Sequence, residues 1–211
     1  MKTDAVIFDI DGTLTNSIRP IIVSWNRHLE TLEYPYVPLD EKLCASLMGK
    51  TMDDWAQAVL PELDLSVSRP ITEIMEQKEN DEIRKNGTDL YPYVKETFEQ
   101  LSSDYDLFIL SNCGKGYIEA VMAHAGIEPY VRGHLCFGDN GIDKPDNLKK
   151  MIHDYDLVHP VYVGDTARDQ ECCEEAGVPF IFVSWGFGDV PDAPYRADSM
   201  KDLADLIPNV I

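Results

Sequence analysis

Short apolar runs alternate with segments of helical periodicity along most of the chain. A run that is apolar at every position is typical of a strand that helices cover on both faces. Four such runs and a weaker fifth lie at residues 5–8, 107–110, 161–163, 179–183 and 135–137. The segments between them that predict helices are residues 93–101, 115–124, 146–154 and 168–175. This order predicts a parallel, doubly wound (Rossmann-like) sheet of the α/β class.

Residues 17–87 interrupt this order. Apolar positions such as Ile21 and Trp25 repeat there at helical spacing, and no run predicts a strand. Prolines divide the segment into what we expect to be short helices, at Pro35, Pro38, Pro61 and Pro70. We therefore expect an inserted all-helical domain at residues 17–87, and an α/β core domain made of residues 1–16 and 88–211.

The charge of the chain excludes one class of partner. The 38 acidic and 18 basic residues give a formal charge of −20, and such a surface repels nucleic acids. It also repels phosphorylated small molecules. An enzyme that binds such an anion must therefore concentrate positive charge at one place, from a metal and a few lysines.

Composition predicts a cytoplasmic protein that does not enter a membrane. No apolar stretch approaches the roughly 18–20 residues of a membrane span, and residues 1–4 precede the first apolar run without a signal-cleavage pattern. Hydrophobic residues make up 44% of the chain and charged residues 27%, as in ordinary globular domains. The five cysteines lack C-x-x-C spacing, so we expect reduced thiols rather than a disulfide framework or a zinc site.

Residues with chemical capability follow the ends of the predicted strands. They are Asp9 and Asp11 after residues 5–8, Ser111, Asn112 and Cys113 after 107–110, Lys144 after 135–137, and Asp165 and Asp169 after 161–163. In open α/β sheets ligands bind outside the carboxyl ends of the strands, so these side chains should meet at one edge. Two carboxylates about 4 Å apart repel by roughly 4 kcal/mol at an effective dielectric near 20, so the group needs a cation. All-oxygen ligation suits Mg²⁺ rather than zinc.

These segments resemble the motifs of the haloacid dehalogenase-like (HAD) hydrolase superfamily. The four motifs are similar, in order, to Asp9-Ile10-Asp11-Gly12-Thr13-Leu14, Ser111-Asn112, Lys144-Pro145 and Gly164-Asp165-Thr166-Ala167-Arg168-Asp169. Residues 90–92 and 175–178 extend the similarity over nearly all of the chain outside the insertion. The branch that the chain resembles is phosphoglycolate phosphatase-like, with a helical cap. Asn16 and Asn147 depart from its common pattern but remove no group that the chemistry needs.

The resemblance implies a Mg²⁺-dependent phosphatase that works through an aspartyl-phosphate. In that pattern Asp9 attacks phosphorus, and Asp11 protonates the leaving oxygen and then activates water. Lys144 neutralises charge on Asp9 and on the phosphate. Ser111 and Asn112 belong to the group that holds the phosphoryl oxygens.

The resemblance also implies a set of metal ligands. Mg²⁺ would bind the carboxylates of Asp9 and Asp165 and the main-chain carbonyl of Asp11. Asp169 would be an outer partner that orients Lys144 or a metal-bound water. Phosphoryl transfer depends largely on positioning and charge stabilisation, and this set of residues provides both.

The insertion would be a mobile cap over the site, which favours a small phosphorylated metabolite as substrate. Phosphoglycolate, short sugar phosphates and nucleoside monophosphates all remain open, as do a monomer and a homodimer. Lys50 lies in a segment that resembles the substrate-specificity loop of the family, so it either reaches the substrate or is a solvated surface lysine. Cys113 either lines the site or packs beside it, and we interpret it as a packing residue.

The sequence also bears on the other functions that occur in this superfamily. A dehalogenase is disfavoured because that branch lacks an acid at the position of Asp11. A phosphonate hydrolase needs a cap lysine for a Schiff base, and the spacing of Lys50 from Gly49 does not suit that role. A phosphomutase remains open. A non-catalytic binding protein should have lost a motif residue, and none is missing.

Overall fold

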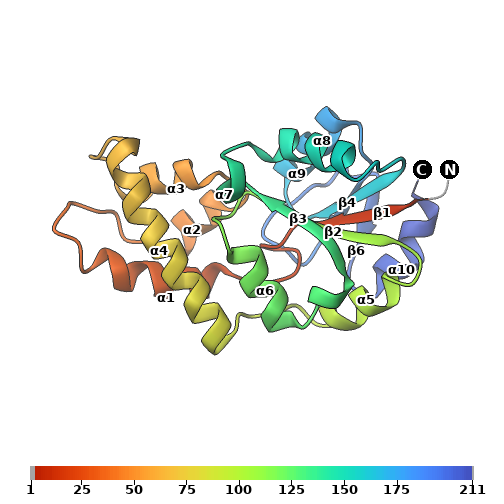
Figure 1. The fold of residues 1–211 in the computed structure, drawn as a ribbon, viewed down its shortest axis with the longest axis horizontal. Coiled ribbons are helices and arrows are strands. Elements are labelled where there is room, and N and C mark those ends of the chain that lie inside the picture. The colour runs from red at the N-terminus through yellow and green to blue at the C-terminus, as the bar shows by residue number, and fades with distance from the viewer. Residues whose placement is uncertain (1–2, 211) are drawn as a thin grey trace.

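Six parallel strands form one sheet in the order β3-β2-β1-β4-β5-β6 (Figure 1). The computed structural model describes residues 3–210. The strands are β1 (Ala5–Phe8), β2 (Asp106–Ser111), β3 (Val131–Cys136), β4 (Pro160–Gly164), β5 (Phe180–Val183) and β6 (Tyr195–Ala197). The chain first builds the sheet outward from β1 to β3, and then returns to place β4 on the other side of β1. The predicted doubly wound α/β fold is confirmed.

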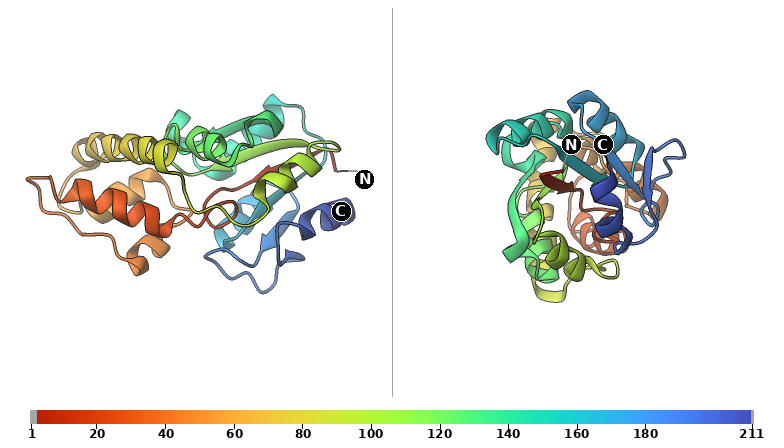
Figure 2. Two further views of the ribbon diagram at one scale, coloured as in Figure 1. Left: turned by 90° about the horizontal axis from the view of Figure 1, so that it is seen from below. Right: turned by 90° about the vertical axis from the view of Figure 1, so that its right-hand side faces the viewer.

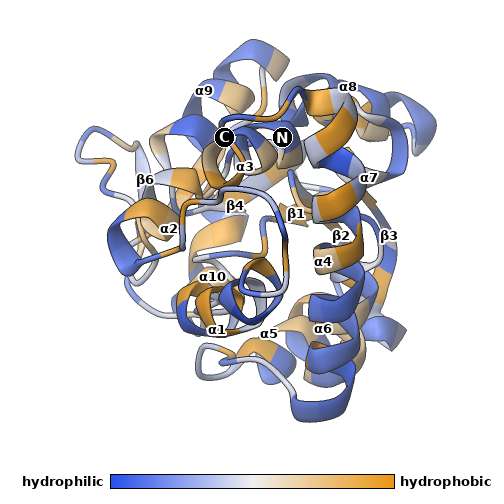
Figure 3. Ribbon diagram, turned by 90° about the vertical axis from the view of Figure 1, so that its left-hand side faces the viewer, coloured by the Kyte–Doolittle hydropathy of each residue, from blue (hydrophilic) through white to orange (hydrophobic). Residues whose placement is uncertain are grey.

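Alternate residues of β1 belong to two different cores, one on each face of the sheet. Val6 and Phe8 pack on the face that carries α5 (Val94–Leu101), α6 (Tyr117–Ala125) and α10 (Asp202–Leu206). Ala5 and Ile7 pack on the opposite face, with α8 (Lys144–Asp154) and α9 (Ala167–Ala176). Figure 3 shows β1 hydrophobic at the centre, with hydrophilic stretches on the surrounding helices. Burial on both faces explains why the sequence of β1 is apolar at every position.

The insertion between β1 and β2 is helical, and it has a hydrophobic cluster of its own. Its helices are α1 (Ile18–Leu29), α2 (Glu41–Leu47), α3 (Met52–Val59) and α4 (Leu65–Asn86). Trp25, Trp55 and Met75, from three of these helices, are buried in that cluster. Figure 2 shows the four helices at one end of the molecule, beyond the sheet.

The two segments that join the insertion to the sheet lie side by side. Thr15 and Leu90 form an antiparallel bridge. The amide of Asn16 donates to the carbonyl of Asp89 at 2.7 Å, and the amide of Tyr91 donates to the carbonyl of Leu14 at 3.0 Å. The division into a core domain and a cap domain at residues 16–17 and 87–88 stays a prediction, and this paired connection lies at that boundary.

Three further short helices lie within the described residues. The helix α7 (Phe137–Asn140) begins directly after β3. Two 3-10 helices, Glu128–Tyr130 and Ile207–Asn209, precede β3 and follow α10.

The structure corrects three details of the sequence prediction. The weak strand lies at residues 131–136 rather than 135–137, because Phe137 already belongs to α7. The sixth strand, β6, was not predicted. Pro70 does not end a short helix but lies inside the 22-residue α4. It is the sixth residue of that helix, so its ring costs the first turns a single backbone hydrogen bond.

The described cysteines are all free and buried, which agrees with the expectation of reduced thiols. Among residues 3–210, no helix combines the length and the apolar character that a membrane span requires. A cytoplasmic location, and a monomer or homodimer, stay predictions.

Phe98 offers a test of how α5 is held against the sheet. Its ring is fully buried, and its centroid lies 4.6 Å from that of Phe8 in β1. We expect Phe98→Ala to lower the free energy of unfolding by about 3–5 kcal/mol, since it leaves a cavity under α5. Urea unfolding measures the change. Val158→Ala, at a side chain that is 70% exposed, is the control and should change stability by less than about 0.5 kcal/mol.

Candidate active site

The predicted site residues meet at the carboxyl edge of the sheet, where β1, β2 and β4 are neighbours. Phe8 is in register with Val163, and the amide of Asp9 donates to the carbonyl of Val163 at 2.9 Å. Asp9 therefore leaves β1 beside the point where Asp165 leaves β4. Ser111 is the last residue of β2, on the other side of β1. The strand order thus brings together residues that are about 100 and 150 positions apart in the chain.

Lys144 is the buried cation of this edge. It is the first residue of α8, its side chain is 2% exposed, and its Nζ lies 3.0 Å from Asp9 Oδ1 and 2.8 Å from Asp169 Oδ1. The contact with Asp169 is a hydrogen bond, whereas the contact with Asp9 is an ion pair without hydrogen-bond geometry. Burial alone would lower the pKa of Lys144, but the charges of Asp169 and Asp9 raise it above its ordinary value. Lys144 therefore stays charged.

Asp169 is fixed by its own helix. Thr166 and Asp169 form a capping box at the start of α9, in which Asp169 Oδ2 accepts from the amide and the hydroxyl of Thr166 at 3.0 and 2.6 Å. This leaves Oδ1 for Lys144. Of the two predicted roles, the structure shows Asp169 beside Lys144. The helix cap and the orientation of the lysine are thus two uses of the same carboxylate.

Three carboxylates crowd this buried edge. Oxygens of Asp9, Asp165 and Asp169 all lie within 4.8 Å of one another, an arrangement that can hold a metal ion. Burial raises the pKa of Asp9 to about 7, against the lowering effect of Lys144. Burial also raises the pKa of Asp165 well above its ordinary value, and the charges of Asp169 and Asp9 add to the rise. These shifts express mainly the cost of burying carboxylates, and in smaller part their repulsion of one another.

The donor set fits a hard divalent cation. Asp165 Oδ2 accepts from the amide of Phe187 at 2.7 Å, but Asp165 Oδ1 is buried without a hydrogen-bond partner. A buried carboxylate oxygen with no partner is costly unless a ligand satisfies it. The carboxylate cluster contains Asp169 where the sequence prediction had Asp11, whose expected contribution is a main-chain carbonyl. All these donors are oxygens, as Mg²⁺ prefers.

Glycines make room for Asp165, and sequence reasoning missed them. A Cβ at Gly12 would lie 2.0 Å from Asp165 Oδ2, and a Cβ at Gly186 would lie 2.3 Å from Asp165 Cβ. Gly12 also has a φ of +83°, in the left-handed region that favours glycine. The loop after β5 therefore encloses Asp165 from one side. Its Trp185 Nε1 donates to the carbonyl of Thr13 at 3.1 Å and fixes the loop against the first motif.

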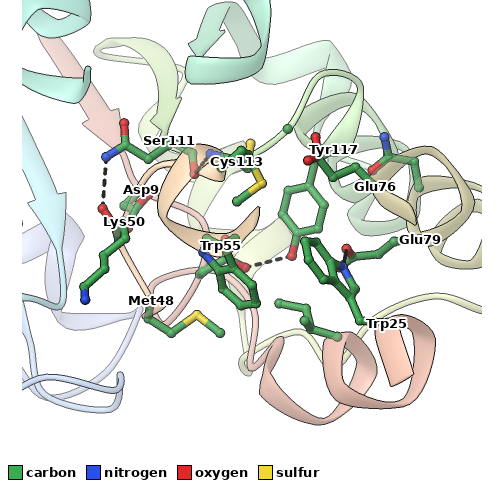
Figure 4. A pocket seen from close by; sticks show the side chains of 17 residues that line it. Asp9, Trp25, Met48, Lys50, Trp55, Glu76, Glu79, Ser111, Cys113 and Tyr117 are labelled. Carbon is green, nitrogen blue, oxygen red and sulfur yellow. Dashed lines mark hydrogen bonds between the residues drawn. The ribbon is translucent and has the colours of Figure 1, made fainter. Parts of the chain in front are cut away.

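Asp11 contacts a tyrosine, Tyr117, that no sequence motif identifies. The hydroxyl of Tyr117, the first residue of α6, donates to Asp11 Oδ1 at 2.7 Å (Figure 4). Burial raises the pKa of Asp11, and this hydrogen bond partly opposes the rise. Burial raises the pKa of Tyr117 well above its ordinary value, with the charge of Asp11 adding to it, so the tyrosine stays a hydrogen-bond donor. Tyr117 thereby fixes the direction in which Asp11 points.

The segment after β2 joins the sheet edge to the insertion. Asn112 Nδ2 donates to the carbonyl of Gly49 at 2.9 Å, while its Oδ1 is buried without a partner. The amide of Cys113 donates to Ser111 Oγ at 3.3 Å, and this cysteine is buried. Asn112 therefore contacts the insertion as well as lying at the predicted phosphate-binding position.

One pocket lies between the sheet edge and the insertion (Figure 4). Its lining includes Asp9, Asp11 and Ser111 from the sheet side. Lys50 and Cys113 also line it, and Lys50 is exposed to solvent. Figure 4 shows the Lys50 side chain pointing away from Trp55 and Trp25, which line the opposite part of the pocket.

Asn147, one of the departures from the family pattern, has a structural explanation. It is fully buried, and its Nδ2 donates to the carbonyl of Ile142 at 2.8 Å. Its Oδ1 accepts from Asn140 Nδ2 at 2.8 Å. The side chain thus holds the turn that precedes Lys144, so the departure supports the position of that lysine.

Comparison with known proteins identifies the family of the chain. The family model described as haloacid dehalogenase-like hydrolase matches residues 6–183. A phosphoglycolate phosphatase of Haemophilus influenzae is 31% identical over 218 residues, which cover 95% of each chain. One of Synechococcus elongatus is 27% identical over 197 residues, which cover 88% of this chain and 85% of the relative.

Solved structures show the same fold. The crystal structure of a predicted phosphoglycolate phosphatase from Haemophilus somnus superposes with a TM-score of 0.82 at 21% identity, covering 97% of this chain and 98% of that one. A haloacid dehalogenase-like hydrolase from Streptococcus pneumoniae gives a TM-score of 0.78 at 21% identity, covering 96% and 97%. The chain therefore belongs to the haloacid dehalogenase-like hydrolases, in their phosphoglycolate phosphatase-like branch, and is a phosphatase.

Proposed function

We propose that this phosphatase hydrolyses a small phosphate monoester with Mg²⁺, through a phosphoryl group carried by Asp9. The observation that supports this most is the position of Asp9. Its carboxylate is 3% exposed, lies beside the ammonium of Lys144, and lines the pocket under the insertion. A buried carboxylate that lines a small pocket is suited to act as a nucleophile on a compact substrate.

The reaction proceeds in two steps. Asp9 attacks phosphorus, the bond between phosphorus and the ester oxygen breaks, and the leaving alkoxide takes a proton from Asp11. Asp11 then removes a proton from water, which attacks the same phosphorus and releases inorganic phosphate and the free Asp9 carboxylate. Tyr117, which donates to Asp11, keeps that carboxyl in one orientation for both proton transfers.

Lys144 and Ser111 carry the charge and the geometry of the phosphoryl group. Lys144 holds Asp9 at 3.0 Å and, through Asp169 at 2.8 Å, has only limited freedom to move. A fixed ammonium of this kind stabilises charge that develops on the transferred phosphoryl oxygens. Ser111 and Asn112 lie at the end of β2, on the same edge.

Asp9 and Asp165 are the carboxylates that would hold Mg²⁺, together with the main-chain carbonyl of Asp11. When bound, the ion neutralises negative charge on the phosphate and on the attacking carboxylate. The partnerless Oδ1 of Asp165 supports this assignment. The small size expected of the substrate rests on the helical insertion, which covers the site, and on the phosphoglycolate phosphatases among the relatives.

Asp9→Asn tests the nucleophile. We expect it to abolish hydrolysis of an aryl phosphate such as p-nitrophenyl phosphate, because an amide cannot form the acyl-phosphate. In the wild type, acid quenching followed by borohydride reduction should mark residue 9 in a peptide mass map. Asp146→Asn, at an exposed acid on α8, is the control and should keep full activity. Turnover that survives in the Asp9 variant would contradict the assignment.

Asp11→Asn tests the general acid and base. We expect kcat to fall by about 10²-fold or more, since the leaving group then departs without a proton. In kcat/KM, which depends only on the steps up to release of the leaving group, the loss should be smaller for p-nitrophenyl phosphate, whose leaving group needs little protonation, than for an alkyl phosphate. An equal loss on both esters would count against proton transfer by Asp11.

Asp165→Asn tests the metal site without any measurement of activity. At a Mg²⁺ concentration about 100 times its Kd, we expect the wild type to gain about 2.7 kcal/mol of stability. Thermal unfolding with Mg²⁺ and with EDTA measures the gain, which should disappear in Asp165→Asn and persist in Asp146→Asn. If the two variants respond alike, Asp165 is not a ligand.

A further inference from the structure

The far wall of the pocket, across from Asp9, is made by the insertion and has a chemistry of its own. Trp25 of α1 and Trp55 of α3 stand there with ring centroids 5.2 Å apart, and Glu79 of α4 lies beside them (Figure 4). Trp25 Nε1 donates to Glu79 Oε2 at 2.6 Å. The two tryptophans are 1% and 4% exposed. We call Trp25, Trp55 and Glu79 the cap wall.

Glu79 is a buried acid with one unused oxygen. It is 6% exposed, and its Oε1 has no hydrogen-bond partner, while Oε2 is bound by Trp25. Burial raises the pKa of Glu79 to about 8, and the hydrogen bond from Trp25 only partly opposes this rise. A carboxyl in this state gains most from a ligand that brings positive charge or donates a hydrogen bond.

Glu76, one turn earlier on α4, is a buried acid that is paired with a base inside the protein. Arg69 Nη1 lies 2.6 Å from Glu76 Oε1, and the same guanidinium is held by Asp53 at 3.0 Å. Glu76 is therefore neutralised inside the protein. Among the described residues, no arginine, lysine or histidine pairs with Glu79 in this way.

Several other polar groups that line the pocket also accept hydrogen bonds. Asn80 Oδ1 and Asn112 Oδ1 are buried without partners and belong to residues that line the pocket. The side-chain amide nitrogens of both residues already donate hydrogen bonds, Asn80 to the carbonyl of Lys115 and Asn112 to the carbonyl of Gly49. The hydroxyl of Tyr117 donates its hydrogen bond to Asp11. A ligand that donates hydrogen bonds therefore suits the free oxygens of this pocket.

We propose that the cap wall binds a protonated amine on the leaving group, so that the substrate is the phosphate monoester of a small amino alcohol. An ammonium group satisfies the free oxygen of Glu79 and lies against two indole faces, which attract cations. A carboxylate on the leaving group would instead meet a second acid with no buried cation to pair with it. This inference rests on the proposed phosphatase function and specifies its substrate.

The experiment compares three phosphate esters of nearly equal size: 2-aminoethyl phosphate, 2-hydroxyethyl phosphate and phosphoglycolate. We expect kcat/KM of the wild type for the amine to exceed that for the other two by at least about tenfold, as a buried charge pair provides. Glu79→Gln, which keeps size and shape, should reduce this preference to less than about threefold. It should leave kcat/KM for 2-hydroxyethyl phosphate within about threefold of the wild type.

Asp81→Asn is the matched control, because it removes one negative charge from the same helix at a side chain that is 80% exposed. It should keep the full preference for the amine. Thermal unfolding checks that Glu79→Gln is folded. An equal or higher kcat/KM for phosphoglycolate or 2-hydroxyethyl phosphate in the wild type overturns the proposal. So does a preference for the amine that survives in Glu79→Gln.

Failure of the proposed function gives a different result. In that case p-nitrophenyl phosphate is not hydrolysed either, and the cap wall is tested by binding alone. Quenching of tryptophan fluorescence then compares 2-aminoethylphosphonate with 2-hydroxyethylphosphonate, neither of which is an ester. Tighter binding of the amine, lost in Glu79→Gln, supports the cap wall as an amine site, and equal binding overturns it.

Discussion

The structure depends on a buried group of charges at the carboxyl edge of the sheet, where Lys144 lies between Asp9 and Asp169 and next to Asp165. Burying charges is costly unless each finds a partner in good geometry. Three carboxylates and one ammonium leave two negative charges when all are ionised, and a single divalent cation neutralises that remainder. The surrounding details serve the same end: the capping box holds Asp169, the amide of Phe187 holds Asp165, and Asn147 holds the turn before Lys144. The chain as a whole has a formal charge of −20, so under the proposed function Lys144 and the bound cation are the positive charges that would meet the phosphate.

The sequence was informative wherever a requirement is local. Strand β1 is buried on both faces, so every residue in it is apolar and the run is visible without a structure. The motif residues follow strand ends, and strand order alone brings them together. Strand β3 lies at the edge of the sheet and carries Arg132 and His134, so only its last residues look like a strand. Strand β6 is a three-residue edge strand, too short to give any pattern.

What the sequence did not reveal are contacts between distant segments. Tyr117 reaches Asp11 across 106 positions, and Trp25 reaches Glu79 across 54. Gly186 is required because Asp165, from another strand, occupies the space where its side chain would be. None of these contacts carries a local signal, because each depends on a neighbour that only the fold supplies. Pro70 is the opposite case, because a proline usually predicts the end of a helix, yet α4 continues through it. The helix loses little by this, since Pro70 lies near its start.

The two ends of the pocket divide recognition between them. Under the proposed function the sheet edge binds the phosphate, which every phosphate monoester contains, and under the proposed amine site the cap wall binds the leaving group, which differs between substrates. A cap that only had to pack would gain stability from an apolar residue at position 79, because a buried carboxyl with a free oxygen is costly. The overall charge acts in the same direction. An aminoalkyl phosphate carries about one negative charge near neutral pH and phosphoglycolate about three, so a strongly acidic protein repels the first much less. The long-range field and the cap wall therefore favour the same class of substrate, although they arise from different residues.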